Sequence, residues 1–377
     1  MPPLLFSTQD PAGTPHLAMI VKRGYHVDRG ACRALPEAPP VVEVPRYVAS
    51  QNAGALNRLA ADSDLFAPFK PSTDVLVSGM ARSLRGPVRC LDTAVRVGPL
   101  RKNVRVHGDR RVQLGTAGRL RFSEAEPFET LPLIWDHAYG GRDLSAEEKL
   151  HPKKSSFARR PEPPLGAIAY PRNPAGRGFF LDMDRERLQG TAAPNLEDPE
   201  DAVTPDRLLA KTSSDWGDRP VAACYAPVDW LSFPRVMLWL GVDYAHPAAP
   251  LVELRRGVLR PEDLIERTPG APPNPRVYNC APTGLSGARL EGGEVASVWN
   301  MHPRHEVWEL QLPRERPRLL LAPPGCGAFE LPAVLQTVWI EPDEDRVTLT
   351  WSGTLEVAAP YPDEMCQTME RAVRWER

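Results

Sequence analysis

The sequence lacks the patterns that mark membrane, secreted and zinc-binding proteins. No run of about 18 apolar residues is present, so we expect no membrane-spanning helix. The start of the chain has no basic segment followed by a long apolar run, which predicts a cytoplasmic protein without a signal peptide. The 6 cysteines are scattered and form no C-x-x-C pair, which disfavours a zinc site and a disulfide scaffold. Reduced, mostly buried thiols are the expectation.

An excess of charge is also missing. The formal net charge is −2, so the chain as a whole has no electrostatic attraction for nucleic acid or for an anionic membrane. We therefore expect neither as a partner.

Catalytic patterns are sparse and weak. The run Asn173 to Gly178 is rich in glycine but lacks the Gly-Lys-Ser/Thr ending of a phosphate loop, so we interpret it as a turn. Asp136 and His137 are adjacent, and adjacent side chains point in different directions. His302 and His305 are separated by a proline that disfavours a shared helix face. We predict no catalytic residue, no metal ligand and no cofactor.

Proline is what the chain has in abundance. The 43 prolines are about twice the usual share, and each one tends to end a helix or to restrict a strand to an edge. Alternating apolar and charged residues, as in residues 94–97 and 104–106, are typical of half-buried strands. The sequence therefore predicts a mainly β fold of the β-rich α+β class. It would have antiparallel sheets or a sandwich-like scaffold, long ordered loops and a few short helices.

Individual elements follow from local patterns. Strands are expected at residues 17–22, 74–79, 94–97, 104–106, 236–242, 295–299 and 307–312, with a hairpin over 337–351. Helices are expected at 52–65, which carries no proline, and at 261–267, which begins with one. The helical spacing of Met365, Met369, Ala372 and Val373 predicts a terminal helix, with Asp363 as its cap.

Three regions are distinguished by composition. Residues 1–126 form an N-terminal β-rich region, and 127–234 form a loop-rich central region packed on the scaffold. Residues 235–377 form a C-terminal β-rich region with a terminal helix. One continuous domain is the alternative.

Several segments together resemble a bacterial domain family of unknown biochemical activity, whose members are encoded beside type VI secretion spike and effector genes. The resemblance runs in order through nearly the whole chain and depends on no single motif. It is weakest over residues 203–242, where Trp216-Gly217-Asp218-Arg219 matches a family Trp-x-x-Arg segment. The other matching segments are Val21-Lys22, Lys70 to Gly79, Val106 to Arg110, Phe128, Leu131 to Leu133, Ala138 to Gly141, Tyr170 to Phe179, Pro194 to Glu197, Tyr278 to Pro282 and the hairpin over 337–351.

The resemblance implies a non-catalytic adaptor or chaperone that binds a secreted effector, a spike protein or both, and that aids loading of the effector. Its motif residues would contact the partner or shape the loops that do: Tyr139, Gly140, Gly141, Tyr170, Asn173, Pro174, Gly176, Gly178, Phe179 and Asn195. Two alternatives remain at this stage. One is a hydrolase-like enzyme that uses His137 and an acidic neighbour, and the other is a structural part of the secretion apparatus. The oligomeric state is not predicted.

Overall fold

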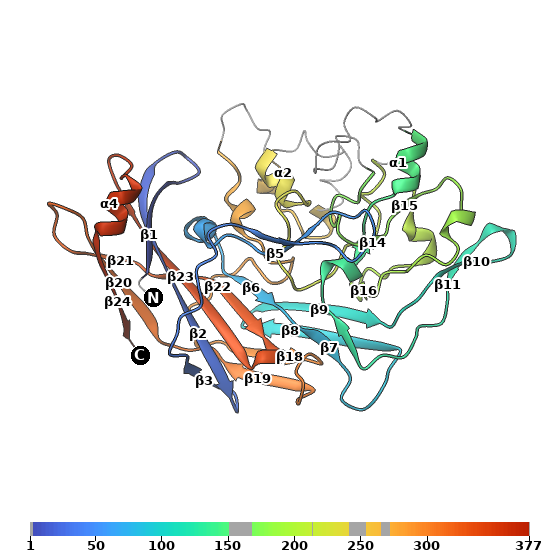
Figure 1. Ribbon diagram of the computed structural model, residues 1–377, viewed down its shortest axis with the longest axis horizontal. Coiled ribbons are helices and arrows are strands. Elements are labelled where there is room, and N and C mark those ends of the chain that lie inside the picture. Colours follow the sequence, from blue (N-terminus) through green and yellow to red (C-terminus); the bar gives the residue numbers. More distant parts are fainter. Residues whose placement is uncertain (1–2, 151–167, 213, 241–253, 265–271, 377) are drawn as a thin grey trace.

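Strands dominate the computed structural model, which describes residues 3–150, 168–212, 214–240, 254–264 and 272–376. The molecule is elongated, and its sheets follow one another along the long axis (Figure 1). The expected β-rich fold with mostly antiparallel sheets, long ordered loops and few short helices is confirmed. No helix in the described part of the chain is long and apolar enough to cross a membrane.

The largest sheet joins the two ends of the chain. Its strand order is β1-β2-β23-β22-β6, and β3 also pairs with β2. β2 is antiparallel to β23 from His16 opposite Glu356 to His26 opposite Arg346, and β6 is parallel to β22. The predicted strands over 17–22 and 74–79 and the hairpin over 337–351 lie in this sheet. Its strands are β1 (Leu4–Gln9), β2 (Pro15–Asp28), β3 (Ala31–Ala34), β6 (Asp74–Val77), β22 (Val334–Glu341) and β23 (Arg346–Glu356).

A second large sheet also combines early and late strands. Its order is β16-β9-β8-β18-β19, and each pairing is antiparallel. The predicted strands over 94–97, 104–106, 295–299 and 307–312 are confirmed here. The members are β8 (Cys90–Val97), β9 (Leu100–His107), β16 (Leu196–Glu197), β18 (Val295–Trp299) and β19 (Val307–Gln311).

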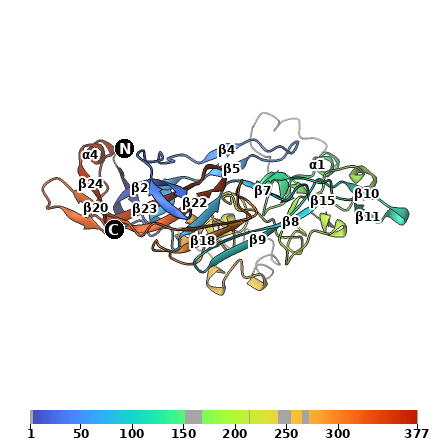
Figure 2. The same cartoon turned by 90° about the horizontal axis from the view of Figure 1, so that it is seen from below.

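Smaller sheets complete the β structure. A three-stranded sheet of β21 (Phe329–Leu331), β20 (Arg316–Ala322) and β24 (Glu370–Glu376) forms one end of the molecule, and β10 (Val112–Leu114) with β11 (Leu120–Phe122) forms the other (Figure 2). The remaining pairs are β4 (Arg46–Val48) with β5 (Arg58–Ala61), β7 (Met80–Arg82) with β12 (Thr130–Pro132), β13 (Tyr139–Gly140) with β14 (Arg177–Gly178), and β15 (Phe180–Leu181) with β17 (Leu209–Ala210).

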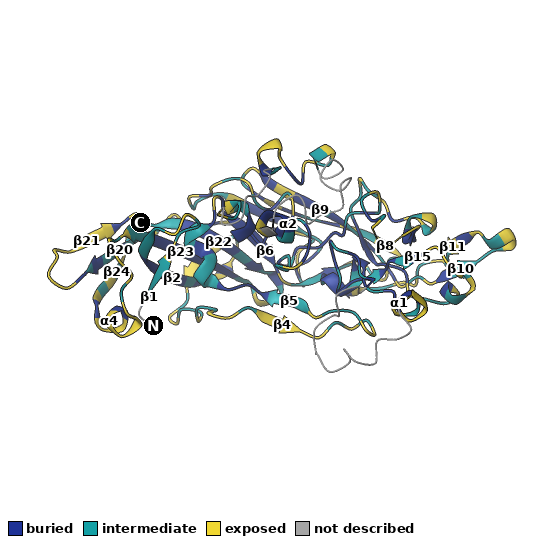
Figure 3. Ribbon diagram, turned by 90° about the horizontal axis from the view of Figure 1, so that it is seen from above, coloured by how far each residue is buried: buried dark blue, intermediate teal, exposed yellow. Residues whose placement is uncertain are grey.

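Two hydrophobic clusters hold these layers together. The first joins the two large sheets and includes Met19, Val104, Val338 and Trp351. The second lies under the central loops and includes Tyr139, Tyr170, Phe179 and Trp216. Buried positions accordingly follow the central strands, while exposed positions lie in outer loops and in peripheral strands such as β4 (Figure 3).

Two expected elements are wrong. The helix expected over 52–65 is wrong, because β5 pairs there with β4 and the Asn52 side chain bonds to distant carbonyl groups instead of supporting a helix. Only residues 64 and 65 are helical, at the start of a 3₁₀ turn. The expected strand over 236–242 is the helix α2 (Arg235–Leu240) as far as the structure describes it, and it follows Pro234, a favoured start for a helix. A short apolar run does not distinguish a strand from a helix by periodicity.

The C-terminal helix is shorter than expected. α4 (Asp363–Thr368) ends before Met369, and its cap is Pro362, without a side-chain hydrogen bond from Asp363. The chain then continues as β24, since pairing with β20 satisfies its backbone groups. Among the described residues, other helical elements are α1 (Leu144–Leu150) and several short 3₁₀ turns, including η1 (Asp64–Phe69), η8 (Pro275–Tyr278) and η7 (Pro261–Asp263). The turn η7 begins at the expected proline, and residues 265–267 lie outside the described part.

Candidate functional site

The expected site residues meet where two loops of the central region cross. β13 lies parallel to β14, with Tyr139 opposite Arg177 and Gly140 opposite Gly178. We call the crossing, residues 138–141 with 170–179, the loop knot. The N–H of Gly141 donates to the carbonyl of Asn173 at 2.8 Å, and the N–H of Phe179 donates to that of Gly140 at 2.9 Å. Segments 30 residues apart are thus joined as one unit.

The glycines of the loop knot permit backbone contacts that a side chain would block. A Cβ on Gly140 would lie 2.1 Å from the carbonyl oxygen of Asn173, and one on Gly141 would lie 2.4 Å from that of Gly176. Gly140 and Gly141 also adopt positive φ values of 150° and 96°. These positions therefore require glycine for the crossing to form.

The buried side chain of Asn173 stabilises the crossing through hydrogen bonds. Its side-chain amide donates to the carbonyls of Trp135 at 2.9 Å and Tyr139 at 3.1 Å. Only 3% of Asn173 is exposed, while Tyr139 and Tyr170 are fully buried with their rings 4.9 Å apart. Phe179, Gly176 and Gly178 are buried too, and Pro174 is partly buried. The side chains of the motif are thus engaged with the protein's own loops.

Asn195 extends the same network toward the second large sheet. Its backbone N–H donates to the carbonyl of His137, and its side chain donates to His107 and to the Asp109 carboxylate at 3.0 Å each. Next to it, Glu197 lies 2.8 Å from the ring of His107. Burial raises the pKa of Glu197, but hydrogen bonds from His107 and from the N–H of Val203 outweigh it and lower the pKa overall. Asn195 therefore anchors the loop knot to β9.

Asn52, which sequence reasoning did not single out, ties a third segment to the loop knot. Its side-chain amide donates to the carbonyls of Asp136, Ala175 and Gly176 at 2.8 to 3.0 Å. Asparagine in a loop has no distinctive sequence pattern, so only the fold shows this role.

Arg172 connects the loop knot to the segment that resembles the family's Trp-x-x-Arg element. Its guanidinium donates to the carbonyls of Trp216, Gly217 and Arg219 and to the hydroxyl of Tyr170. It also lies 4.9 Å from the ring of Trp216. The segment therefore keeps a packing role in this chain.

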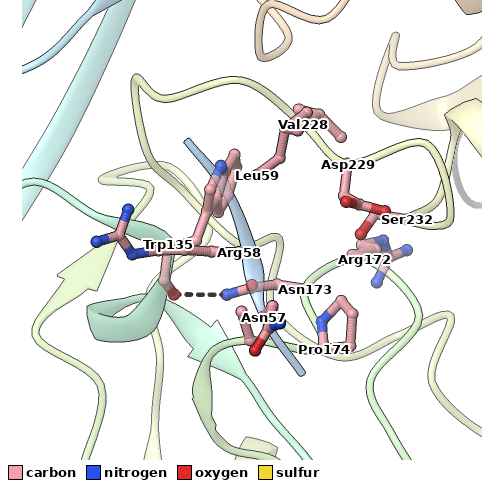
Figure 4. A pocket seen from close by; sticks show the side chains of 11 residues that line it. Asn57, Arg58, Leu59, Trp135, Arg172, Asn173, Pro174, Val228, Asp229 and Ser232 are labelled. Carbon is pink, nitrogen blue, oxygen red and sulfur yellow. Dashed lines mark hydrogen bonds between the residues drawn. The ribbon is translucent and has the colours of Figure 1, made fainter. Parts of the chain in front are cut away.

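A small cavity borders the loop knot. Trp135, Asn173 and Pro174 line one part of it, and Val228, Asp229 and Ser232 another (Figure 4). Its volume is about 20 Å³, which is room for a single water molecule. Burial raises the pKa of the Asp229 carboxyl. A cavity of this size does not hold an organic substrate.

Exposed apolar side chains lie near this cavity, on the loop that carries Leu231, on strand β4 and on helix α2. Leu231 is 70% exposed, Trp239 45% and Tyr47 47%. Trp230 packs edge-on against Trp239 at 5.9 Å and against Phe66 at 4.8 Å, and its indole N–H donates to Asp62. We call Tyr47, Trp230, Leu231 and Trp239 the aromatic patch. Rigid aromatic residues that remain accessible are frequent anchors of protein–protein contacts.

The histidines considered for catalysis have structural contacts. Asp136 pairs with Arg58 at 2.8 Å and accepts the N–H of Gln51. The ring of His137 lies 3.2 Å from the Gln51 side chain. His302 is buried, bonds to Asp345 at 2.8 Å and stacks on His305 and Trp308. Within the described residues, no three His, Cys, Asp or Glu side chains are grouped to hold a metal ion. All 6 cysteines are free.

Two further family-like segments meet inside the first cluster. Asp74 accepts the N–H groups of Cys280 and Ala281 and the side-chain amide of Asn279. It also pairs with Lys70 at 2.7 Å, and both side chains are buried. Burial lowers the pKa of the Lys70 ammonium, but the Asp74 carboxylate outweighs this and raises the pKa overall. Through these bonds, Asp74 fixes residues 70–74 to residues 279–281.

Comparison with protein-family models gives one match, over residues 12–352, to the family described as "Uncharacterized protein conserved in bacteria (DUF2169)". The chain belongs to this family. No curated protein and no solved structure matches it. The DUF2169 match includes the loop knot, the aromatic patch and the Lys70–Asp74 pair, and it ends before α4 and β24.

Proposed function

We propose that this DUF2169 protein is a non-catalytic adaptor or chaperone of the cytoplasm. It would bind a type VI secretion effector and help to load the effector onto the spike. The observation that carries this proposal is the location of the aromatic patch directly beside the loop knot. The residues expected from the family resemblance hold loops in place, and Trp230 and Leu231 of the patch lie on a loop that packs against them.

The arrangement suits recognition of a protein better than chemistry on a small molecule. Leu231 and Ser232 follow Asp229 and Trp230 in one loop, and Ser232 lines the cavity that Asn173 also lines. The loop knot thus supports the loop that carries Trp230 and Leu231. Loops held by a rigid scaffold are common binding surfaces.

Trp230 gives the aromatic patch a fixed base. Arg235 lies 4.0 Å from the Trp230 ring and pairs with Asp62, which also accepts the indole N–H. Because Trp230 is fixed before a partner arrives, less conformational entropy is lost on binding.

The test is co-purification with effectors encoded next to its own gene. The tagged full chain should retain one of these effectors from its native cells, and deletion of the gene should lower the level of that effector and its secretion. Unchanged effector abundance and secretion in the deletion strain would overturn the proposal.

A further inference from the structure

In the part of the chain that the structure describes, no strand lies beside the outer edge of β24. β24 is the last strand of its sheet and pairs only with β20. Pro317 lies opposite Trp375 and has no N–H to donate to it. The N–H of Met369, just before β24, donates to the carbonyl of Met365 in α4. Both facts place the hydrogen-bonded pairs with β20 at residues 370, 372, 374 and 376. The N–H and C=O groups of Arg371, Val373 and Trp375 therefore point away from the sheet.

These outward groups have no backbone partner elsewhere in the described chain. The strand itself is held firmly. Arg23 lies 4.3 Å from the ring of Trp375, and the Arg371 guanidinium donates to the carbonyl of Pro3 at 2.9 Å. A fixed strand with free backbone groups is a template for another strand.

The charges on this edge favour one particular strand as the occupant. Glu370, Ala372 and Arg374 alternate on the exposed face, and neither Glu370 nor Arg374 forms an ion pair within the described residues. The neighbouring Glu376, by contrast, pairs with Arg318. Glu370 and Arg374 have opposite charges and lie four positions apart on one face. In an antiparallel pair of two such strands, each of these charges can face the opposite charge of the other copy.

The register of such a strand pair follows from the numbers of the residues that face each other. If Arg371 of one copy exchanges hydrogen bonds with Val373 of the other, Glu370 lies opposite Arg374 on both sides of the two-fold axis. Of the two neighbouring registers, one places Glu370 opposite Glu376, and the other places Glu370 opposite Ala372 and Arg374 opposite Thr368, so neither pairs the opposite charges. Opposite charges across a strand pair stabilise it and like charges destabilise it, so one register is selected.

We propose that two copies of this protein associate through their β24 edges, antiparallel, with Glu370 of each facing Arg374 of the other. The sheet lies at one end of the molecule and the loop knot lies toward the opposite end (Figure 1), so the association leaves the aromatic patch and the loop knot accessible. β24 is outside the residues matched by the DUF2169 model, and the inference does not rest on the proposed function.

The test is sedimentation velocity of the full chain over a range of concentrations. The wild-type protein should dimerise, while Glu370→Arg and Arg374→Glu should each raise the dissociation constant by roughly tenfold, because two attractive pairs become repulsive. The double variant Glu370→Arg/Arg374→Glu should restore the wild-type value, and circular dichroism should show all four proteins equally folded. A wild-type protein that stays monomeric at every concentration overturns the proposal, and so does a double variant that associates no better than the single variants.

Discussion

The carbonyl oxygen of Asn173 lies 2.1 Å from the point where a side chain on Gly140 would begin. Gly140→Ala should therefore separate the two segments of the loop knot, in addition to straining a backbone with positive φ. We expect a loss of about 3 kcal/mol or more in the free energy of unfolding, measured by urea denaturation.

Gly190→Ala is the matched control for this substitution. Gly190 also has a positive φ, of 81°, but a Cβ there meets no atom within 4 Å. The free energy of unfolding of this variant should fall by only about 1 kcal/mol, which is the cost of the backbone strain alone. Equal losses for the two variants would contradict the close contact at Gly140.

Removing the charge of Asp74 from its buried ion pair with Lys70 should strongly lower the stability of the protein. Asp74→Asn keeps the size of the side chain but leaves the Lys70 ammonium buried without its carboxylate. The expected loss is about 3 to 5 kcal/mol, observable as a lower midpoint of thermal or urea unfolding.

Asp182→Asn serves as the comparison for that variant. Asp182 pairs with Arg185 on the surface, where solvent screens the interaction, so the midpoint should hardly move. An Asp74→Asn protein as stable as the Asp182→Asn protein would show that the buried pair contributes little.

The acid sensitivity of the protein should depend in part on His137. Burial, followed by the nearby Arg177, lowers the pKa of this histidine from 6.5 to about 4. Between these values the unfolded chain binds one proton more than the folded chain, so stability falls as the pH drops from 6.5 to about 4. The loss amounts to about 3 kcal/mol at most.

His137→Asn should remove this contribution. The free energy of unfolding of the variant, measured from pH 7 to 4, should depend less steeply on pH than that of the wild-type protein. Parallel curves for the two proteins would exclude His137 as the group responsible.

The aromatic patch gives a prediction about binding. Leu231→Asp places a charge on a side chain that is 70% exposed, so folding should be unaffected while effector co-purification is lost. Val295→Asp, at an exposed apolar position of the second large sheet, should retain the effector. Retention of the effector by the Leu231→Asp protein would exclude the patch as the contact.

Periodicity in the sequence predicts the large sheets well, because strands such as β8 and β9 alternate buried and exposed residues. It fails for β24, where Met365 and Met369 suggested a helix that the pairing with β20 ends. The deciding contact is with a strand about 50 residues earlier, and a local pattern carries no information on it.

The candidate site shows the same limit. The glycines and Asn173 of the loop knot stand out in the sequence because their residue types suit turns. Asn52, Leu231 and Trp239 do not stand out in the sequence. Their roles come from segments that converge only in the folded chain.

The pairing of β2 with β23 determines when this protein can fold. The ribosome makes residues 15–28 long before residues 346–356, yet these residues form adjacent strands of one sheet. Until residues 346–356 have emerged, the apolar side chains of Leu17, Met19 and Ile20 have no neighbouring β23 to pack beside. Such long-range pairing is slow and leaves strands open to aggregation in the meantime. We therefore expect the nascent chain to be prone to aggregation until these strands pair, and recombinant production to benefit from slow synthesis at low temperature.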